Sequence, residues 1–348
     1  MGTLTYSAAD TAFIAAHFPA VTIEKWMGCS SVPGCYNHDN GAAAAPACPT
    51  QEDATLATAR LLKAAAPAIS VVTWTDSMRI YSRPSLNPDI ENKGDQNCVR
   101  NAATPFLEAH RAYLLKNATG GLALDAYIHA HVYDHTQSLV RDFWRDACTN
   151  MTATGLIDGC GADASQQNGT TMVEGLLPAT AAAWSAAHVW AVGNTTAALA
   201  VRGHVVLGKV EAQLGVSTNG VLQEGCVAGN ATITTLRAAA ARAAADAKRY
   251  VYECHSNGSP DDLAAFLIGA GADHYFGFGA WVDDLPAASH WVAEMGFPLG
   301  APVADAAYDA PTATWSRAFA SAAGRTNVTF DARTNRGAIA WASTRALL

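Results

Sequence analysis

The sequence predicts a parallel α/β fold of the (β/α)₈ TIM barrel class, and three observations support this. Short β-rich runs alternate with helix-like stretches along most of the chain, which is the order that parallel strands with crossover helices require. Eight such runs can be counted, the number that closes a barrel. The chain also lacks the glycine-rich phosphate turn that is typical of a doubly wound sheet.

The predicted strands are short runs rich in β-branched and aromatic residues, bounded by turn-forming residues. They comprise residues 21–26, 70–75, 121–127, 155–159, 204–210, 220–224, 249–254 and 274–279. Helical periodicity predicts helices between them, over residues 51–65, 135–147, 178–192, 232–248 and 261–269. Thr50 is a candidate N-cap for the first of these helices, and Pro260 precedes the acidic start of the last.

The C-terminal part of the chain changes character. Short alternating segments at residues 315–320, 327–331 and 338–341, with a turn at residues 333–337, predict antiparallel strands. We therefore expect a barrel over residues 1–300 and a small antiparallel β appendage, packed on the barrel, over residues 301–348.

Composition excludes some classes of partner. Asp and Glu number 30 against 22 Lys and Arg, for a net charge of −8, and no basic cluster is present. Nucleic-acid affinity is built mainly from clustered Lys and Arg, so no nucleic-acid partner is expected. No run of about eighteen apolar residues occurs either, so no membrane span is expected.

Two features indicate a secreted protein from an oxidising eukaryotic compartment. The cysteines are even in number and form no CxxC pair, which favours disulfides over zinc or redox chemistry. They are Cys29, Cys35, Cys48, Cys98, Cys148, Cys160, Cys226 and Cys254. Glycosylation sequons number seven where chance predicts about two: Asn117, Asn150, Asn168, Asn194, Asn230, Asn257 and Asn327. Cys226 and Cys254 are placed to bridge the ends of neighbouring strands.

Polar residues at the carboxyl ends of the predicted strands are the candidates for chemistry, because active sites of (β/α)₈ enzymes lie there. Two carboxylates stand in matched contexts, since Asp158 and Glu224 each follow a short apolar run and each precede Gly-Cys. They end the fourth and sixth predicted strands, and alternate strands contribute to one layer of a barrel. We expect them to face each other as the acid pair that glycoside hydrolysis requires.

A ring of further strand-end residues is expected to bind substrate, with aromatic rings stacking on the apolar faces of sugars. These candidates are Glu24, Lys25, Trp26, Trp74, Asp76, Asp125, Tyr127, His129, Lys209, Glu211, Glu253, His255 and Trp281, with Tyr275 as a further aromatic. For each aromatic the alternative is ordinary packing, and for each acid the alternative is a solvated loop position or a structural ion pair.

A rival constellation lies at residues 129–135. His129, His131, Asp134 and His135 resemble the ligand sets of dinuclear zinc hydrolases, in which imidazoles and a carboxylate share metal ions. The spacing departs from the known patterns, so polar contacts to sugar and structural histidines stay open as alternatives.

Several segments resemble one known family, the hypothetical glycosyl-hydrolase-like family 15, whose members are distantly related to polygalactosaminidase-like hydrolases. The similar segments span nearly the whole chain and comprise residues 13–25, 264–271, 275–281, 298–302, 315–319 and 327–330. The resemblance implies a (β/α)₈ fold, a polysaccharide-directed role, and the strand-four Asp158 and strand-six Glu224 as catalytic acids. It supplies no substrate.

Three hypotheses follow, and each makes a different demand on the structure. The first is a secreted glycoside hydrolase that cleaves a polysaccharide or glycan with the pair Asp158 and Glu224 and needs no cofactor or metal. The second is a non-catalytic glycan-binding or structural extracellular glycoprotein, capable of self-assembly, on the same barrel. The third is a metal-dependent hydrolase that uses the histidine cluster.

Overall fold

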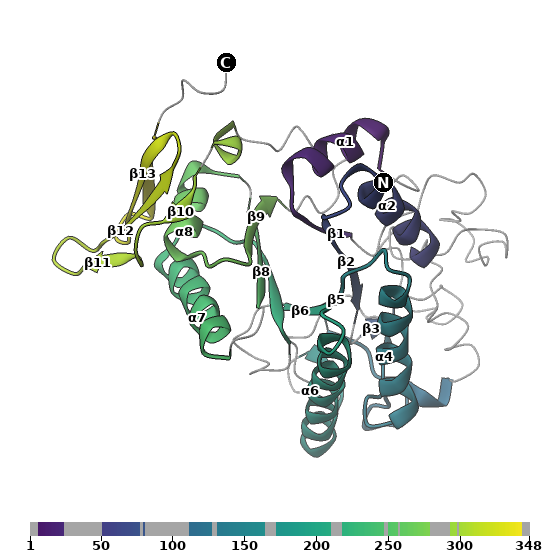
Figure 1. Ribbon diagram of the computed structural model, residues 1–348. Helices are drawn as coiled ribbons and strands as arrows, with labels where there is room; N and C mark the ends of the chain where they lie inside the picture. Colours follow the sequence, from purple (N-terminus) through teal and green to yellow (C-terminus); the bar gives the residue numbers. More distant parts are fainter. Residues whose placement is uncertain are drawn as a thin grey trace, which may run out of the picture. The chain divides into compact units, whose positions relative to one another are not determined.

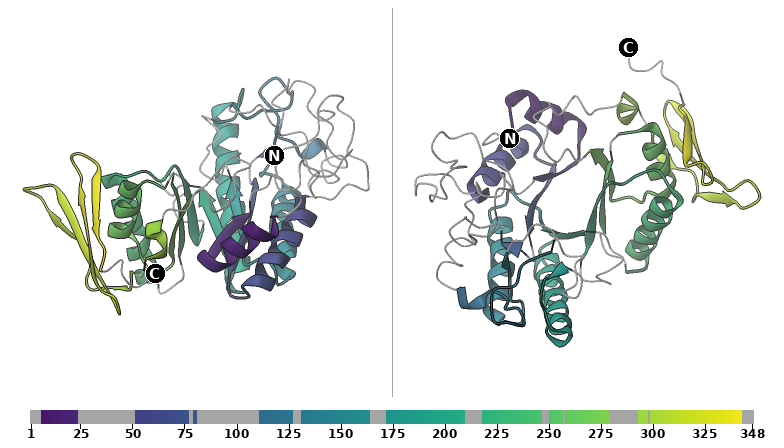
Figure 2. Two further views of the ribbon diagram at one scale, coloured as in Figure 1. Left: turned by 90° about the horizontal axis from the view of Figure 1, so that it is seen from above. Right: turned by 180° about the vertical axis from the view of Figure 1, so that it is seen from behind.

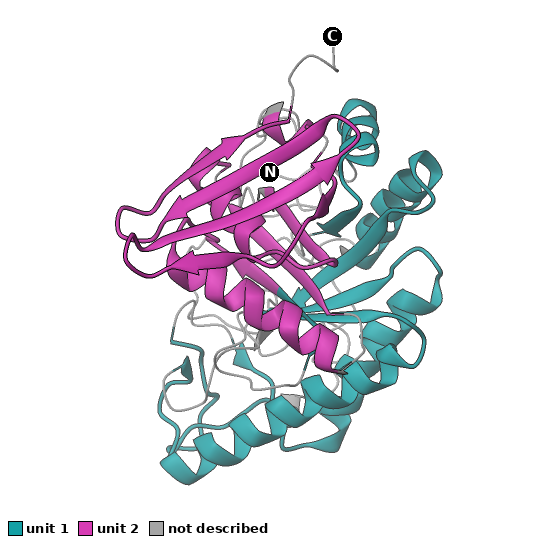
Figure 3. Cartoon of the chain, turned by 60° about the vertical axis from the view of Figure 1, so that its left-hand side comes forward, with its two compact units in different colours: residues 1–221, 282–284 teal, residues 222–281, 285–348 magenta. Residues whose placement is uncertain are grey.

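The computed structural model of the 348-residue chain is drawn in Figure 1. It describes residues 6–23, 51–76, 79–80, 111–126, 131–163, 172–209, 218–246, 250–256, 258–278, 293–297 and 299–342. Two compact units are distinguished by colour in Figure 3. The first comprises residues 1–221 and 282–284, and the second comprises residues 222–281 and 285–348.

Unit 1 contains four parallel strands rich in small and β-branched residues: β1 Ala20–Ile23, β2 Ser70–Asp76, β5 Gly159–Asp163 and β6 Val205–Lys209. They lie in the order β1-β2-β5-β6. The registers pair Val72 with Gly159 and Gly159 with Val205. Strands buried on both faces need continuous apolar runs, and Val71, Val72 and Val206 are at most 1% exposed.

Helices of unit 1 bury one face each. They are α1 Ala8–His17, α2 Gln51–Ala65, α4 Ser138–Ala153 and α6 Pro178–Ala200. Ser7 caps α1 by accepting a hydrogen bond from the amide of Asp10 at 3.0 Å. Helices α4 and α6 pack side by side (Figure 1). A disulfide joins Cys148 of α4 to Cys160 of β5 and so ties the helix to the sheet.

A smaller antiparallel element of unit 1 comes from the segment between β2 and α4. It pairs β3 Arg79–Ile80 with β4 His131–Val132, near the 3₁₀ helix η2 Arg111–Tyr113. The predicted strand at residues 121–127 is wrong in its described part, because Leu122, Leu124 and Asp125 form only isolated bridges outside the parallel sheet. Leu115 and Ala123 of this segment form a separate apolar cluster with Trp184 of α6.

Unit 2 contains the parallel strands β8 Val251–Ser256 and β9 His274–Phe278, with the end of β7 Gly220–Glu224, whose first two residues belong to unit 1. Two helices pack together, α7 Asn230–Asp246 and α8 Pro260–Gly269. Gly269 permits this approach, because a Cβ there would collide with Leu236 and with the backbone of Ile233.

The antiparallel sheet of unit 2 covers α8 (Figure 2). After the 3₁₀ helix η5 Ala293–Gly296 come β10 Ala301–Pro302, β11 Ala307–Asp309, β12 Thr314–Ser321, β13 Gly324–Asp331 and β14 Arg336–Ala340. Strand alternation buries Phe319, Val328 and Phe330 on its inner face. The antiparallel strands that the C-terminal sequence predicts are therefore present.

The fold class is α/β, with a parallel barrel-like sheet and a small antiparallel sheet. In sheet order the parallel strands are β1-β2-β5-β6-β7-β8-β9, which is also their order in the chain. A doubly wound sheet would reverse that order at a switch point. The described residues supply seven strands to this sheet, because the run at residues 121–127 does not join it. The boundary at residue 300 and the full (β/α)₈ count stay predictions.

Candidate active site

The two faces of the unit 1 strands differ in chemistry. Cys160 and Ala162 of β5 and Val206 of β6 pack with Trp144, Val192 and Leu199 of the helices, and therefore point outward to the helical layer. Side chains alternate along a strand. Asp163 of β5 and Lys209 of β6 consequently lie on the opposite face, together with Trp74 of β2.

Asp163 is the last residue of β5, and its side chain is only 2% exposed. Lys209, the last residue of β6, places Nζ 3.2 Å from its Oδ1. Asp76 ends β2 and is paired with Asp163 in the strand register. The carboxyl ends of three neighbouring strands thus carry two acids and one lysine. Asp163 and Lys209 thus form a buried ion pair at this edge of the sheet.

Trp74 lies on the same face of the sheet as the Asp163–Lys209 ion pair. Its side chain is 1% exposed, and its ring lies against Gly161, the register partner of Trp74 on β5. A Cβ at Gly161 would overlap the indole ring, so glycine is what permits the tryptophan to lie flat on β5. Among the described residues the indole Nε1 has no hydrogen-bond partner.

Asp158 occupies a different place from the one expected. The strand begins at Gly159, so the prediction that residues 155–159 form a strand ending at Asp158 is wrong. Asp158 precedes β5, and its Oδ2 accepts hydrogen bonds from Lys63 Nζ at 2.6 Å and from the Val71 amide at 2.8 Å. Val71 is near the start of β2, so Asp158 lies at the amino ends of these strands. The residue that ends the strand is Asp163.

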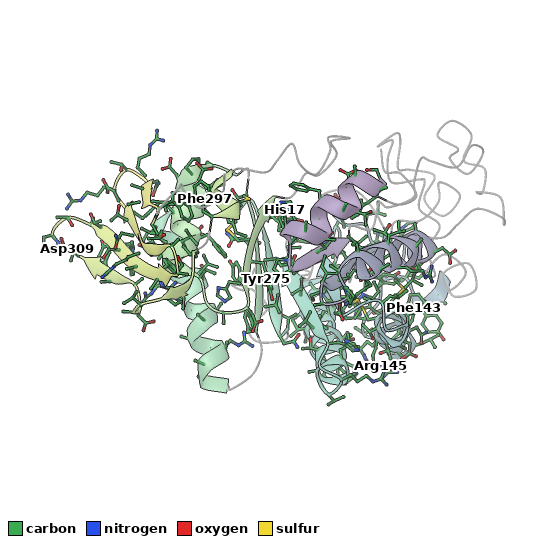
Figure 4. All side chains as sticks on the ribbon, turned by 45° about the horizontal axis from the view of Figure 1, so that its top comes forward. His17, Phe143, Arg145, Tyr275, Phe297 and Asp309 are labelled. Atoms are coloured by element: carbon green, nitrogen blue, oxygen red, sulfur yellow. A yellow bond between two sulfur atoms is a disulfide. The ribbon has the colours of Figure 1, made fainter. Side chains whose placement is uncertain are left out.

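In unit 2, alternation again separates an apolar face from a polar one. Phe276 of β9 contacts Phe266 of α8 at 5.2 Å between ring centroids, and it is the register partner of Cys254. Cys254 is bonded to Cys226, as the sequence indicates. Glu253, with its register partner Tyr275, therefore points to the other face. Tyr275 is labelled on β9 in Figure 4.

Three polar side chains lie on the polar face of the unit 2 strands, Glu224 on β7 and Glu253 and His255 on β8. Glu224 is the last residue of β7 and is half-buried. Glu253 of β8 is 4% exposed, and its Oε2 lies 3.3 Å from Nε2 of His255. On the helical face, the Tyr252 hydroxyl donates to Gln223 Oε1, so alternation turns the next residue, Glu224, to the polar face. A carboxylate next to an imidazole is a competent proton donor and acceptor.

The histidine cluster of unit 1 is packed as part of the core. The rings of His135 and His188 stack at 4.7 Å, and both residues are fully buried. Burial lowers the pKa of His188 well below its usual value, and the neighbouring His135 lowers it further. Asp134 accepts hydrogen bonds from the amide and hydroxyl of Thr136 in a turn. His131, on β4, is 5% exposed, and no group of three ligand residues is placed to hold a metal ion within the described ranges.

Of the remaining predicted residues, some lie in the part of the chain that the structure describes and others lie outside it. Asp125 is fully buried, in a bridge to Val173. Outside the described residues lie Glu24, Lys25, Trp26, Tyr127, His129, Glu211, Trp281, Cys29, Cys35, Cys48, Cys98, Asn168 and Asn257. The cysteines that are described form two disulfides. Of the helices that the structure describes, none combines the length and apolarity of a membrane span.

The parallel α/β fold, with acidic residues at the carboxyl ends of its strands, defines a class of barrel-like α/β proteins. The chain belongs to hypothetical glycosyl hydrolase family 15, whose family model matches residues 63–323. The resemblance seen in the sequence is thereby confirmed.

Several solved structures are similar to this chain at low sequence identity. A cycloalternan-degrading enzyme from Trueperella pyogenes is 13% identical, with a TM-score of 0.47 over 77% of this chain and 40% of its own. A xylosidase from Aspergillus niger is 12% identical, with a TM-score of 0.45 over 81% of this chain and 44% of its own. This chain thus spans under half the length of these proteins. No curated protein matches the chain.

Proposed function

We propose that this protein is a secreted glycoside hydrolase that cleaves a polysaccharide or glycan with two strand-end carboxylates. Membership of a glycosyl hydrolase family supports the reaction class. The observation that carries the proposal is the buried Asp163 at the carboxyl end of β5, held 3.2 Å from Lys209. The disulfides of both units support an oxidising, extracellular location.

The proposal assigns Asp163, in place of Asp158, as the acid of β5. Glycoside hydrolysis needs a carboxylate that acts as nucleophile or base, and barrel enzymes carry such groups at the carboxyl ends of their strands. Asp163 meets this positional requirement, and it is buried 3.2 Å from the ammonium group of Lys209. Asp158 instead binds Lys63 and the Val71 amide at the opposite end of β5, as a structural ion pair does.

Glu224 is proposed as the second acid, which protonates the leaving oxygen. It ends β7 and is half-buried, on the polar face that Glu253, His255 and Tyr275 share in unit 2. We propose that Glu253 and His255 hold substrate hydroxyl groups and that Tyr275 stacks on a sugar ring. In unit 1, we propose that Trp74 and Asp76 of β2 and Lys209 of β6 contact the substrate.

The test is a matched set of carboxylate-to-amide variants in the full chain. Purified protein is screened on algal and cell-wall polysaccharides, and kcat and KM are measured on the substrate found. Asp163→Asn and Glu224→Gln are expected to lower kcat at least 100-fold, because each removes a group that acts in the transition state. Asp158→Asn is the matched control: it is expected to lower Tm and to keep kcat within about twofold, since it removes only an ion pair.

Two results would contradict the assignment. Full activity of Asp163→Asn, with loss of activity in Asp158→Asn, would return the role to Asp158. Glycan binding without turnover by the wild-type protein would favour the non-catalytic glycan-binding alternative over hydrolysis.

A further inference from the structure

An aromatic surface adjoins one of the sequons of unit 2. Asn230 is the first residue of α7, is exposed, and begins the sequon Asn230-Ala-Thr232. Trp315 of β12 reaches it from the antiparallel sheet, and the indole Nε1 donates a hydrogen bond to Asn230 Oδ1 at 2.8 Å. The contact joins residues 85 positions apart, so the sequence pattern alone does not reveal it.

The rings around this contact are partly open to solvent and are held in place. Tyr308 of β11 is 47% exposed, and its ring centroid lies 4.7 Å from that of Trp315. On α7, Arg237 places its guanidinium 5.1 Å from the Trp315 ring centroid and donates to the carbonyl oxygen of Ala306. A cation over an indole face fixes the ring. Tyr308 and Trp315 thus form a fixed aromatic platform next to Asn230.

The side chain of Asn230 is held in an orientation that can carry a glycan. Its Oδ1 is bonded to the indole, and its Nδ2 makes no hydrogen bond to any of the described residues. Asn117 differs: its Oδ1 accepts from both the amide and the hydroxyl of Thr119, and its Nδ2 points to the Leu122 carbonyl oxygen. The indole therefore holds the Asn230 side chain in one orientation and leaves the nitrogen that carries an N-linked sugar available.

We propose that Asn230 bears an N-linked glycan whose first N-acetylglucosamine packs on Trp315 and Tyr308. In the modification, Nδ2 of Asn230 forms a bond to the anomeric carbon of the sugar and loses one proton. The bond between that carbon and the diphosphate of a lipid-linked oligosaccharide donor breaks, and the diphosphate leaves. The apolar face of the pyranose ring then covers aromatic surface that is otherwise wet. The glycan attaches β11 and β12 to the start of α7.

A second exposed sequon, which lies on the antiparallel sheet itself, provides the matched control. Asn327 lies on β13, and its register partners are Ala318 and Ala340. Its Oδ1 accepts a hydrogen bond from Arg325 Nε at 3.1 Å. A glycan at Asn327 has no aromatic ring among these neighbours to pack on, so its removal is expected to leave the stability of unit 2 unchanged.

The experiment combines site mapping with thermal unfolding of the full chain from a eukaryotic secretory host. Glycopeptide mass spectrometry is expected to find Asn230 occupied. Asn230→Gln is expected to lower Tm by about 2–4 °C, because the sugar then no longer covers the rings of Trp315 and Tyr308. In a Tyr308→Ser background the same change is expected to cost less than half as much, because the platform is already lost. Asn327→Gln is expected to change Tm by less than about 1 °C.

The same variants are also made in a host without N-glycosylation. This separates the effect of the sugar on Tm from the effect of the hydrogen bond between the Trp315 indole and Asn230. There, Asn230→Gln removes only that hydrogen bond, and its effect on Tm is expected to be smaller. An unoccupied Asn230, equal Tm losses in both hosts, or strict additivity with Tyr308→Ser would each overturn the proposal. Binding of free oligosaccharide to the unglycosylated Tyr308–Trp315 platform would also overturn it, in favour of a surface for external carbohydrate.

Discussion

Single residues decide where the candidate active site is placed. Asp158 and Asp163 are five positions apart, yet one pairs with Lys63 beside the start of β2 and the other with Lys209 at the end of β6. Their surroundings follow from the start of β5 at Gly159. The strand begins at residue 159 and not at residue 155 as predicted. Because of this four-residue difference, Asp158 forms a structural ion pair and Asp163 becomes the candidate catalytic residue.

His274 gives a residue-scale prediction on pH. Burial lowers the pKa of His274 to about 4, with Asp273 opposing and Arg317 adding to the decrease. The neutral ring accepts a hydrogen bond from the Gly271 amide through Nδ1 at 3.0 Å, and it contacts the ring of Tyr252. Protonation would convert this acceptor into a donor and break the bond.

Because the folded-state pKa lies below the unfolded value of 6.5, the unfolded chain binds a proton first as the pH falls. The stabilisation is complete above about pH 6.5 and is lost progressively down to about pH 4, by up to about 3 kcal/mol. We expect His274→Asn, which keeps a neutral acceptor, to show a smaller decrease in Tm between pH 7 and pH 4.5 than the wild type. Identical decreases would show that His274 does not titrate in this range.

At the scale of elements, helix α8 is bound at both ends by the antiparallel sheet. At its amino end, Asp261 accepts hydrogen bonds from the Gly337 amide at 2.8 Å and from Arg336 Nη1 at 2.9 Å. The Gly337 bond, followed by Arg336, lowers the pKa of Asp261. At its carboxyl end, Arg317 Nη1 donates to the carbonyl oxygens of Leu267 and Ala270, at 3.0 and 2.6 Å. Negative and positive groups thus match the helix dipole.

Arg317 gives the element-scale prediction. Its guanidinium satisfies carbonyls that the end of a helix leaves without intrahelical partners, and burial lowers its pKa. Arg317→Met keeps a long side chain but removes the donors, so we expect the free energy of unfolding to fall by about 2–3 kcal/mol. Urea unfolding measures this loss. Arg325→Met, at an exposed position of the same sheet, is expected to cost less than about 0.5 kcal/mol, and an equal loss in both variants would contradict the capping role.

For the whole molecule, the cysteines allow a test of the proposed extracellular location. Each unit contains a disulfide between a strand and a neighbouring element, Cys148–Cys160 and Cys226–Cys254. Such bonds form and persist in oxidising compartments.

We expect all eight cysteines to be oxidised in protein produced by a eukaryotic secretory host. Alkylation under denaturing conditions without reductant should then add no mass to the chain, and alkylation after reduction should modify all eight. Reduction should also lower the stability of the chain, by about 2–4 kcal/mol for each bond that closes a loop in the unfolded state. Eight reactive thiols without reductant would contradict the secretory location.

Much of the molecule was predictable from the sequence because local patterns encode it. Residues 51–65 and 220–224 have the predicted bounds, since Ala- and Leu-rich helical periodicity and a compact apolar strand are local signals. The α/β class, the antiparallel C-terminal strands and the family follow from the same patterns. The pairing of Cys226 with Cys254 was predictable too, because both lie at the ends of neighbouring predicted strands.

Only the tertiary structure decided where β5 begins and which face of the sheet each of its side chains occupies. Gly155, Leu156 and Ile157 have the composition of a strand, but they form the connection after α4, and β5 is built from the glycine-rich segment Gly159–Asp163. Glycine is unfavourable in isolated strands. It is needed here because Trp74 lies against Gly161. The sequence by itself determined that this is a disulfide-bearing α/β protein of its family, since hydrophobic periodicity and motif spacing are local. Which carboxylate ends β5, and which residues meet Trp315, depended on contacts between distant segments.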